Sequence, residues 1–270
     1  MIMINGEQGR SIHVMDRAVM YGDGVFRTMR MDHGQIKCWP QQYQKLASDC
    51  QALDILCPAR KTLEQELEQF AIDDPDCVVK IIVSRGEGGR GYRVPTSASP
   101  NRVVLSVPLP DFPKAYWQDG VQLHLCEIRL SHQPRLAGIK HLNRLENVLA
   151  RMEWTDPDVP EGLLLDAEGW VVEGTMSNIF MRLGNKLLTP DLSACGVNGL
   201  QRERILKHAP TLGLTPTVSH FNFPSLLQAD EIFISNSLIG IWPVRQIAAV
   251  PITLGPTAPK LQQILEQEID

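Results

Sequence analysis

Hydrophobic and polar residues follow two different periods in the first hundred positions. Residues 24–39, GVFRTMRMDHGQIKCW, suit strands and turn at Asp32 to Gly34, so they predict a β-hairpin preceded by a strand in MIMING. Residues 40–55 carry apolar side chains at helical spacing behind Pro40, which predicts a helix. β-Branched residues concentrate in 77–85 and 101–109 and predict two more strands. The first half is therefore expected to be an α/β domain.

Residues 108–120, PLPDFPKAYWQDG, carry three prolines within six positions and resist both helix and sheet, so they predict a connector between domains. We place the boundary at Pro113, which gives domains 1–113 and 114–270. The second domain is expected to hold a strand at 121–129, a meander of strands over 161–190, a helix over 200–208, a strand near 231–237 and a C-terminal amphipathic helix. A further helix should begin at about Leu142 and bury one apolar face, formed by Leu142, Leu145, Leu149 and Met152.

Composition narrows the class of protein. The 270 residues are 43% hydrophobic with a net charge of −5, so a substantial core is expected and no overall basic field favours nucleic acid. No run approaches the length of a membrane span, and the N-terminus lacks a signal-peptide pattern, so we expect a cytoplasmic protein with no membrane partner. The six cysteines form no C-x-x-C pair and the seven histidines no H-E-x-x-H motif, so we expect no dedicated metal site.

The glycine-rich stretch SRGEGGRGYR invites a dinucleotide-binding interpretation. Its G-x-G-x-x-G pattern follows a predicted strand, but Pro95 and Pro100 prevent the helix whose N-terminus would hold a pyrophosphate. We interpret it instead as a flexible loop whose arginines, Arg85, Arg90 and Arg93, grip an anionic ligand. A solvated basic loop without a ligand stays open as the plainer interpretation.

Lys140 is the most sheltered of the nine lysines. It follows the short apolar run LAGI, in which Gly138 allows close approach of backbone or ligand, and it precedes the predicted helix. Lys80, within the strand CVVKIIV, is the other candidate for an inward-facing amine. A partly buried lysine can supply the neutral amine that Schiff-base chemistry requires. Considered alone, Lys140 is still more simply interpreted as a surface lysine.

Three downstream segments suit a phosphorylated pyridine cofactor. Glu173 stands in an apolar strand, where a carboxylate needs a cation such as a pyridinium or an arginine. GVNGLQRERIL is a glycine turn that leads into a helix, whose free N–H groups suit a phosphate. ISNSL places Asn236 and Ser237 at a strand end. Each segment also has the plainer interpretation of an ordinary turn or ion pair.

Taken together and in this order, the segments resemble the fold-type IV pyridoxal-phosphate enzymes. The resemblance covers nearly the whole chain, from DRAVMYGDGVFRTMR through IKHLNRLENVLA, EGWVVEGTMSNIF and GVNGLQRERIL to QADEIFISNSLIGIWPV. It implies a two-domain α+β or α/β fold with a smaller N-terminal α/β domain, a larger C-terminal mixed α/β domain and the cofactor between them. Within this group, SRGEGGRGY, LAGIKHLNRLE and CGVNG are most similar to the aminodeoxychorismate lyases.

The resemblance also implies roles for particular residues. Lys140 would bind the aldehyde of pyridoxal 5'-phosphate, and Glu173 would face its pyridine nitrogen. The phosphate would be held by the backbone of Leu200 and Gln201, by Asn236 and Ser237, and by Lys45, which stands where the group usually has an arginine. Thr28 would lie on the substrate side as a catalytic helper, and the substrate would be bound by Arg90, Tyr92 and Arg30.

The implied reaction converts 4-amino-4-deoxychorismate, a small anionic substrate, into 4-aminobenzoate and pyruvate. A D-amino-acid or branched-chain aminotransferase on the same fold is the alternative, and a non-catalytic module that binds a phosphorylated ligand is a remote one. The resemblance further implies a homodimer.

Overall fold

The computed structural model describes residues 1–268, and its chain divides into two units. Of the described residues, the N-terminal unit comprises Met1–Asp111 and Ile139–Asn143, and the C-terminal unit comprises Phe112–Gly138 and residues 144–268. The single predicted boundary at residue 113 differs from this division, because a short segment returns to the N-terminal unit. The N–H of Phe26 donates to the carbonyl of Lys140 at 3.0 Å, and the N–H of Leu142 donates to that of Gly24 at 2.9 Å.

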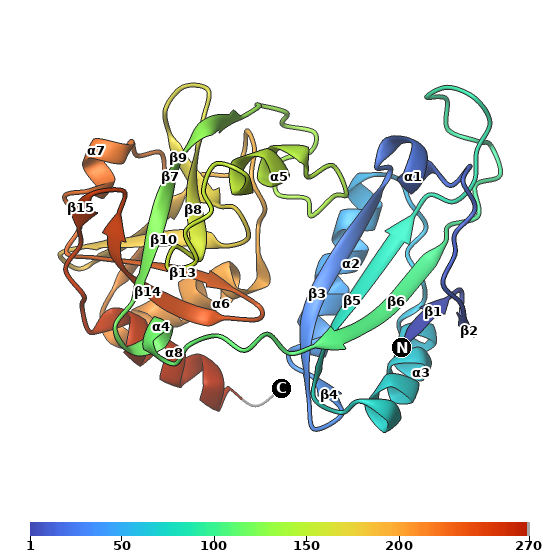
Figure 1. The fold of residues 1–270 in the computed structure, drawn as a ribbon, viewed down its shortest axis with the longest axis horizontal. Coiled ribbons are helices and arrows are strands. Elements are labelled where there is room, and N and C mark those ends of the chain that lie inside the picture. Colours follow the sequence, from blue (N-terminus) through green and yellow to red (C-terminus); the bar gives the residue numbers. More distant parts are fainter. Residues whose placement is uncertain (269–270) are drawn as a thin grey trace. The chain divides into compact units, whose positions relative to one another are not determined.

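An antiparallel sheet of six strands forms the N-terminal unit (Figure 1). Its spatial order is β2-β1-β6-β5-β3-β4. The strands are β1 Ile2–Ile4, β2 Glu7–Gln8, β3 Gly24–Asp32, β4 Gln35–Ile36, β5 Cys77–Ser84 and β6 Arg102–Pro108, and the helices are α1 Arg17–Tyr21, α2 Trp39–Ala52 and α3 Arg60–Asp73. The predicted hairpin, helix and strand pair are all confirmed.

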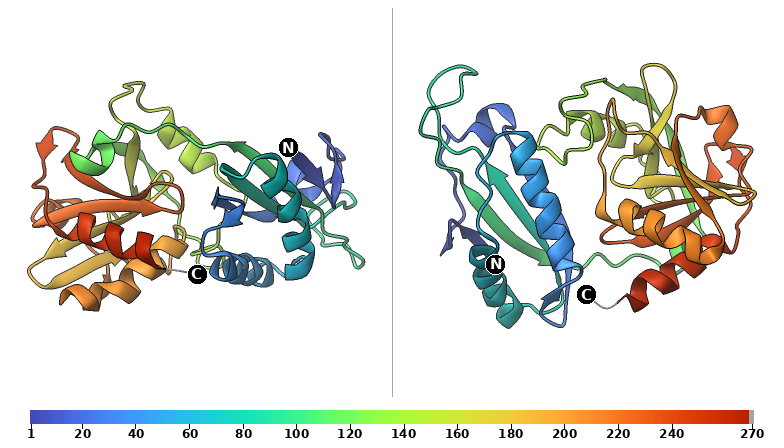
Figure 2. Two further views of the ribbon diagram at one scale, coloured as in Figure 1. Left: turned by 90° about the horizontal axis from the view of Figure 1, so that it is seen from below. Right: turned by 180° about the vertical axis from the view of Figure 1, so that it is seen from behind.

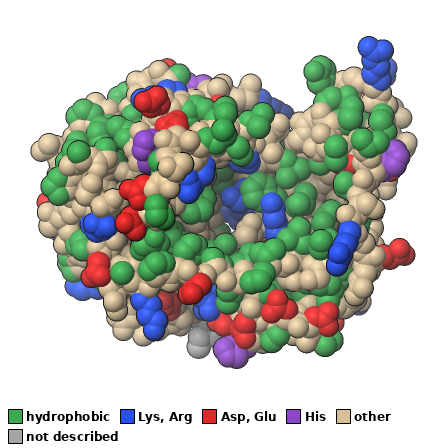
Figure 3. Space-filling view, in the orientation of Figure 1, with side chains coloured by type: hydrophobic (Ala, Val, Ile, Leu, Met, Phe, Trp, Pro, Cys, Tyr) green, Lys and Arg blue, Asp and Glu red, His purple; other side chains and the backbone are tan. Residues whose placement is uncertain are grey.

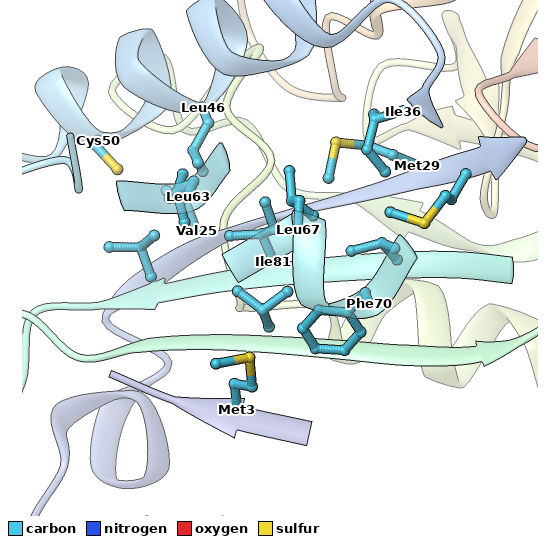
Figure 4. Close-up of a cluster of buried hydrophobic side chains, with 14 of the residues drawn as sticks. Met3, Val25, Met29, Ile36, Leu46, Cys50, Leu63, Leu67, Phe70 and Ile81 are labelled. Atoms are coloured by element: carbon cyan, nitrogen blue, oxygen red, sulfur yellow. The ribbon is translucent and has the colours of Figure 1, made fainter. Parts of the chain in front are cut away.

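Helices α2 and α3 cover one face of this sheet, as Figure 2 shows for α2. Leu46 of α2 and Phe70 of α3 pack with Met29 and Ile81 of the sheet, and each of these four side chains is at most 1% exposed (Figure 4). Successive residues of β3 alternate between this core and the opposite face. The alternation leaves Phe26, Thr28 and Arg30 on the face away from the helices.

The C-terminal unit contains a nine-stranded mixed sheet. Eight strands follow the order β12-β11-β10-β13-β14-β7-β8-β9, and β15 pairs with β14. The strands are β7 Val121–Leu130, β8 Glu161–Asp166, β9 Val171–Gly174, β10 Asn178–Leu183, β11 Lys186–Pro190, β12 Thr215–Ser219, β13 Glu231–Asn236, β14 Gly240–Ile247 and β15 Val250–Pro251. The helices are α4 Ala115–Gln118, α5 Leu145–Arg151, α6 Leu200–His208, the 3₁₀ helix η1 Ala209–Leu212, α7 Phe223–Leu226 and α8 Thr257–Gln267. The predicted meander, helix 200–208 and C-terminal helix are confirmed.

Two sequence expectations about helices are wrong. The connector contains the four-residue helix α4, whose Tyr116, with the neighbouring Trp117, packs edge-on against the buried Trp242 at centroid distances of 5.0 and 5.7 Å. The helix expected from Leu142 begins only at Leu145, because the preceding residues pair with β3. Its apolar face is not buried: Leu145 is 75% exposed and Met152 71%.

No helix within residues 1–268 combines the length and the hydrophobicity that a membrane span requires.

Candidate active site

Lys140 is anchored in the N-terminal unit by its own backbone. Its carbonyl accepts from Phe26, and its N–H donates to Oδ2 of Asp49 at 3.3 Å. Its Nζ lies over the Phe26 ring, 4.6 Å from the centroid. The N–H and the carbonyl of Lys140 are therefore both hydrogen-bonded to neighbouring elements, so the backbone that carries the amine is held in place.

A buried ion pair supports this anchor. Arg27 of β3 and Asp49 of α2 form a hydrogen-bonded salt bridge, and both side chains are less than 10% exposed. Arg27 also donates to the carbonyl of Lys45 at 3.4 Å. The same carboxylate therefore joins Arg27 to the Lys140 backbone, and the same guanidinium reaches the helical turn that carries Lys45. Charge complementarity of this kind fixes the register of α2 against β3.

A second lysine shares the aromatic ring beside Lys140. Lys80 Nζ lies 4.8 Å from the centroid of Phe26, and Lys80 pairs in register with Thr28. Arg30 lies two residues further along the same face and points a guanidinium nitrogen at Asp32 Oδ1, 3.9 Å away. The N-terminal unit thus gathers the amines of Lys140 and Lys80 over one ring, with Thr28 and Arg30 further along the same face of β3.

The arginines of the glycine-rich loop lie in different environments. Arg85 is 7% exposed, forms a salt bridge to Asp23 at 2.7 Å and donates to the carbonyls of Leu53 and Asp54. Its expected role in gripping a ligand is wrong, because its donors are used within the fold. Arg17, itself buried, binds Asp23 at 2.7 Å and donates to the carbonyls of Gly91 and Tyr92.

The outer part of the loop remains on the surface. Arg90 and Arg93 are exposed, and Tyr92 is 84% exposed with its ring 5.3 Å from that of Tyr21. Figure 3 shows basic side chains at the outer end of this loop, between β5 and β6. The loop therefore combines a buried arginine base with an exposed basic and aromatic tip.

Glu173 is a buried carboxylate of the C-terminal unit. It lies in β9, is 4% exposed, and its Oε2 accepts from the N–H of Val197 at 2.8 Å. The residue before Val197 is Gly196, with φ +87°, and a Cβ there would lie 2.8 Å from both Leu192 Cδ2 and Val172 Cγ1. A glycine is therefore required for this loop to pass close to Glu173.

The turn after Glu173 is organised by a second buried carboxylate that sequence reasoning missed. Glu161 of β8 is fully buried and accepts from the N–H groups of Thr175 and Met176 and from the hydroxyl of Ser177. This network fixes the β9–β10 turn and so the strand end that carries Glu173.

The N-terminus of α6 lies at the end of the same loop. Gly199 precedes the helix, and among residues 1–268 no side chain caps this end. The side chain of Asn178 holds the approach: its Nδ2 donates to the carbonyl of Val197 at 2.8 Å, and its Oδ1 accepts from the N–H of Gly199 at 3.2 Å. The first N–H groups of a helix have no intrahelical acceptor, so the N–H groups of Leu200 and Gln201 suit an anion.

Ser235 faces the same side of the sheet. It pairs in register with Asn178, and its neighbour Phe233 on that face packs against Ile205 of α6. The Ser235 side chain is 1% exposed, and its Oγ has no hydrogen-bond partner in the described part of the chain. A buried hydroxyl without a partner next to an uncapped helix N-terminus is an additional donor that points to a ligand.

The β13–β14 turn carries the other two residues expected at a phosphate. Asn236 Oδ1 accepts from the N–H groups of Leu238 and Ile239, and its Nδ2 donates to the carbonyl of Met176 at 3.1 Å. The Asn236 side chain therefore shapes the turn. Ser237 follows in that turn, partly buried.

The sequence did not indicate the residues that hold the expected site residues in position. Asp49, Asn178 and Arg202 are buried polar side chains inside otherwise ordinary helix or strand patterns. Arg202, in the first turn of α6, donates to Asn198 Oδ1 and to the carbonyl of Pro190, both at 2.9 Å. No local spacing marks Asp49 and Asn178, because their partners Lys140 and Val197 lie 91 and 19 residues away in sequence.

Comparison with known proteins identifies the family. The sequence profile of the family described as amino-transferase class IV matches residues 24–247. An aminodeoxychorismate lyase of Vibrio harveyi is 36% identical over 252 residues, covering 92% of each chain. The crystal structure of 4-amino-4-deoxychorismate lyase from Pseudomonas aeruginosa has a TM-score of 0.95 at 41% identity and covers all of both chains.

A more distant structure shares the fold. The branched-chain amino acid aminotransferase from T.th., solved with pyridoxamine 5'-phosphate, has a TM-score of 0.86 at 22% identity, covering 98% of this chain and 92% of that one. The expected fold class is confirmed. The chain belongs to the amino-transferase class IV family and has the fold-type IV architecture of its members.

Proposed function

We propose that this protein is a pyridoxal-phosphate-dependent lyase that converts 4-amino-4-deoxychorismate into 4-aminobenzoate and pyruvate. The observation that carries the proposal is the full-length likeness to the lyase of Pseudomonas aeruginosa, at a TM-score of 0.95 and 41% identity. An aminotransferase activity on D-amino or branched-chain amino acids is the alternative, because it would use the same cofactor residues.

The residues of the chain suit pyridoxal phosphate. The C-terminal unit offers a buried carboxylate, Glu173, for a protonated ring nitrogen, and the uncapped start of α6 with the unpartnered hydroxyl of Ser235 for a phosphate. Gly199 allows the Asn178 side chain to approach the start of α6 closely, since a Cβ there would meet Asn178 Oδ1 at 2.4 Å. We assign Lys140 to the aldehyde, and Lys45, Leu200, Gln201, Asn236 and Ser237 to the phosphate.

When bound, pyridoxal phosphate would supply an aldehyde for the substrate amine and a ring that can accept an electron pair. The chain moves the protons. Lys140 removes the hydrogen from the substrate ring carbon that bears nitrogen, and in its protonated form it donates to the oxygen of the departing enolpyruvate. Thr28, on the face of β3 beside Lys80, assists at that oxygen, and such assistance contributes about 10²–10⁴ in rate. Glu173 keeps the pyridine nitrogen protonated.

We propose that Arg90, Tyr92 and Arg30 bind the anionic substrate. Arg90 and Tyr92 are exposed at the tip of a loop whose base is fixed by Arg85 and Arg17, so they can reach a ligand without losing their anchor. A planar guanidinium pairs with a carboxylate through two hydrogen bonds. The substrate carboxylates are the groups that these residues would recognise.

The purified enzyme tests the proposal directly. Incubation with aminodeoxychorismate should release 4-aminobenzoate and pyruvate, whereas incubation with D-alanine or a branched-chain amino acid plus 2-oxoglutarate should give little transamination. Efficient transamination without 4-aminobenzoate release would overturn the lyase assignment. Absence of the visible absorption of bound cofactor would overturn both enzymatic interpretations and favour a non-catalytic module.

Lys140 can be tested against a matched lysine. Lys140→Ala should abolish turnover and the visible absorption of lysine-bound cofactor. Lys80→Ala removes the other amine over the Phe26 ring and should keep that absorption. Retention of full activity by Lys140→Ala would refute its role.

We also propose a homodimer. The exposed apolar side chains of α5 and its C-cap, Leu145, Val148, Leu149 and Met152, are candidates for burial between two copies. Light scattering of the native protein and of Leu149→Glu measures the assembly state. A monomeric native protein would exclude the dimer.

The cytoplasmic location expected from the sequence stays a prediction.

A further inference from the structure

We propose that His132, Asp166 and Cys195 form a binding site for one zinc-class divalent cation. All three belong to the C-terminal unit. One ligand atom from each side chain, a ring nitrogen, a carboxylate oxygen and the sulfur, lies within 4.8 Å of the other two. Nitrogen, oxygen and sulfur donors in one cluster are the set that zinc and its soft neighbours favour.

The geometry of the cluster is close to that of a bound ion. Zinc lies about 2.0–2.3 Å from such ligands, so ligand atoms around a tetrahedral ion stand about 3.5 Å apart. His132 Nε2 and Asp166 Oδ2 are already 2.9 Å apart. Binding an ion therefore requires this pair to separate and the sulfur, which lies within 4.8 Å of a ring nitrogen and a carboxylate oxygen, to come to about the same spacing. The His132 side chain is 31% exposed, which leaves access for the ion and for a water as fourth ligand.

The side chains around the cluster hold its ligands in place. Asp166 is 4% exposed, and its Oδ1 accepts from the N–H groups of Glu168 and Trp170, which leaves Oδ2 directed at His132. The other ring nitrogen of His132 lies 3.9 Å from Glu168 Oε1. This separation is longer than a hydrogen bond, so the exposed Glu168 carboxylate must move closer to support the ring as the outer carboxylates of many zinc sites do.

The backbone joins this cluster to the loop that holds Glu173. The N–H of Gln133 donates to the carbonyl of Ala194 at 2.8 Å, and the N–H of Gly138 donates to that of Gly196 at 2.9 Å. Val197, two residues after Cys195, donates to Glu173. A cation held by His132 and Cys195 would clamp these two segments together and restrain the donor to Glu173.

Zinc titration of the metal-free holoenzyme tests the site. We expect one zinc per chain by equilibrium dialysis, an upward shift of Tm with zinc, and thiolate-to-metal charge-transfer absorption with cobalt, read as a difference from Cys195→Ala. Cys195→Ala and His132→Gln should each weaken zinc binding more than about 100-fold, since loss of an outer-shell partner alone costs about 10–100-fold.

The exposed cluster Asp32, His33 and Asp76 supplies the matched control, because it is the other group of potential ligands in residues 1–268. His33→Ala should leave zinc affinity unchanged. The proposal is overturned if the native protein binds no zinc, if both site variants keep native affinity, or if His33→Ala removes the binding. Because His132 is partly exposed, His132→Gln tests the site even if the cysteine variant folds poorly.

Discussion

Two loops of this protein contain glycines in patterns typical of phosphate binding, and the structure uses them differently. The loop after β5, with Gly86, Gly88 and Gly91, is fixed at its base by Arg17 and Arg85 and leads into no helix. The loop before α6, with Gly196 and Gly199, passes a buried carboxylate and ends at an uncapped helix N-terminus. Glycine spacing therefore identifies a loop, whereas the element that follows decides whether the loop can hold a phosphate.

The same contrast separates the roles of the side chains. At the base of the first loop the buried Arg17 and Arg85 pair with the half-buried Asp23 and fix the backbone. In the second loop the buried polar groups leave donors available for a ligand. A loop of the first kind can carry substrate-binding groups at its tip, and a loop of the second kind can hold a cofactor.

A glycine from each loop gives the largest expected contrast. Gly196→Ala combines left-handed strain, about 1–2 kcal/mol, with overpacking against Leu192 and Val172, about 1–3 kcal/mol, so we expect about 2–5 kcal/mol of destabilisation in urea unfolding. Gly91→Ala has a similar φ of +90° but no neighbour within 4 Å, and should cost only about 1–2 kcal/mol. If the two variants lose equal free energy of unfolding, the two loops do not differ in how closely their glycines are packed.

Two arginines of the first loop should differ in what their replacement changes. Loss of Arg85 should lower the stability of the fold, and loss of Arg90 should weaken substrate binding. Arg85→Met leaves Asp23 with one partner and two carbonyls without donors, so we expect about 2–3 kcal/mol of destabilisation. Arg90→Met should change stability by less than about 0.5 kcal/mol and instead raise the KM for the anionic substrate. Urea unfolding and steady-state kinetics of both variants measure the division, and a normal KM for Arg90→Met would argue against its role.

Asn178 tests the second loop. Asn178→Ala removes both bonds to the segment before α6, so we expect about 1–2 kcal/mol of destabilisation and roughly tenfold weaker binding of pyridoxal phosphate. Asn178→Asp keeps the acceptor for Gly199 but sets a buried carboxylate oxygen against the Val197 carbonyl, so it should lose at least as much stability and weaken phosphate binding further. Titration of the protein with pyridoxal phosphate, monitored by the absorption of the cofactor, gives the affinity. If the alanine variant keeps the native affinity, Asn178 does not contribute to the phosphate site.

Low pH should also destabilise the first loop, by less than the substitutions described above. Burial acts to raise the pKa of Asp23, but the hydrogen bonds and charges of Arg85 and Arg17 outweigh it and hold that pKa below its ordinary value. The stabilisation is therefore present above the unfolded-state pKa of about 3.9 and is lost as pH falls through the lower folded-state value. Proteolysis within residues 85–101 by an acid-active protease should rise below about pH 4. Asp23→Asn should show fast cleavage at every pH; a pH-dependent rate in that variant would point to another group.

Local pattern predicted most elements of the fold. The hairpin at 24–39, helix α2, the strand pair 77–85 and 101–109, the meander and helix α6 follow from period and turn residues within a few positions of each other. The predicted helix after Lys140 was misplaced because residues 139–143 bond to β3, a partner more than a hundred residues earlier. Arg85 was misassigned because its partners, Asp23 and the carbonyls of residues 53 and 54, are equally invisible to local spacing.

The sequence by itself determined the family, the elements that carry the site and the identity of Lys140 and Glu173 as its candidate residues, because the segments that carry these features are continuous. Only the tertiary structure decided which polar groups are already paired within the fold and which are left for a ligand. Asp49 holds the Lys140 backbone, Asn178 holds the approach to α6, and His132, Asp166 and Cys195 meet across gaps of about thirty residues. The physical reason is that hydrogen bonds and metal coordination depend on distance in space, whereas a motif records only distance along the chain.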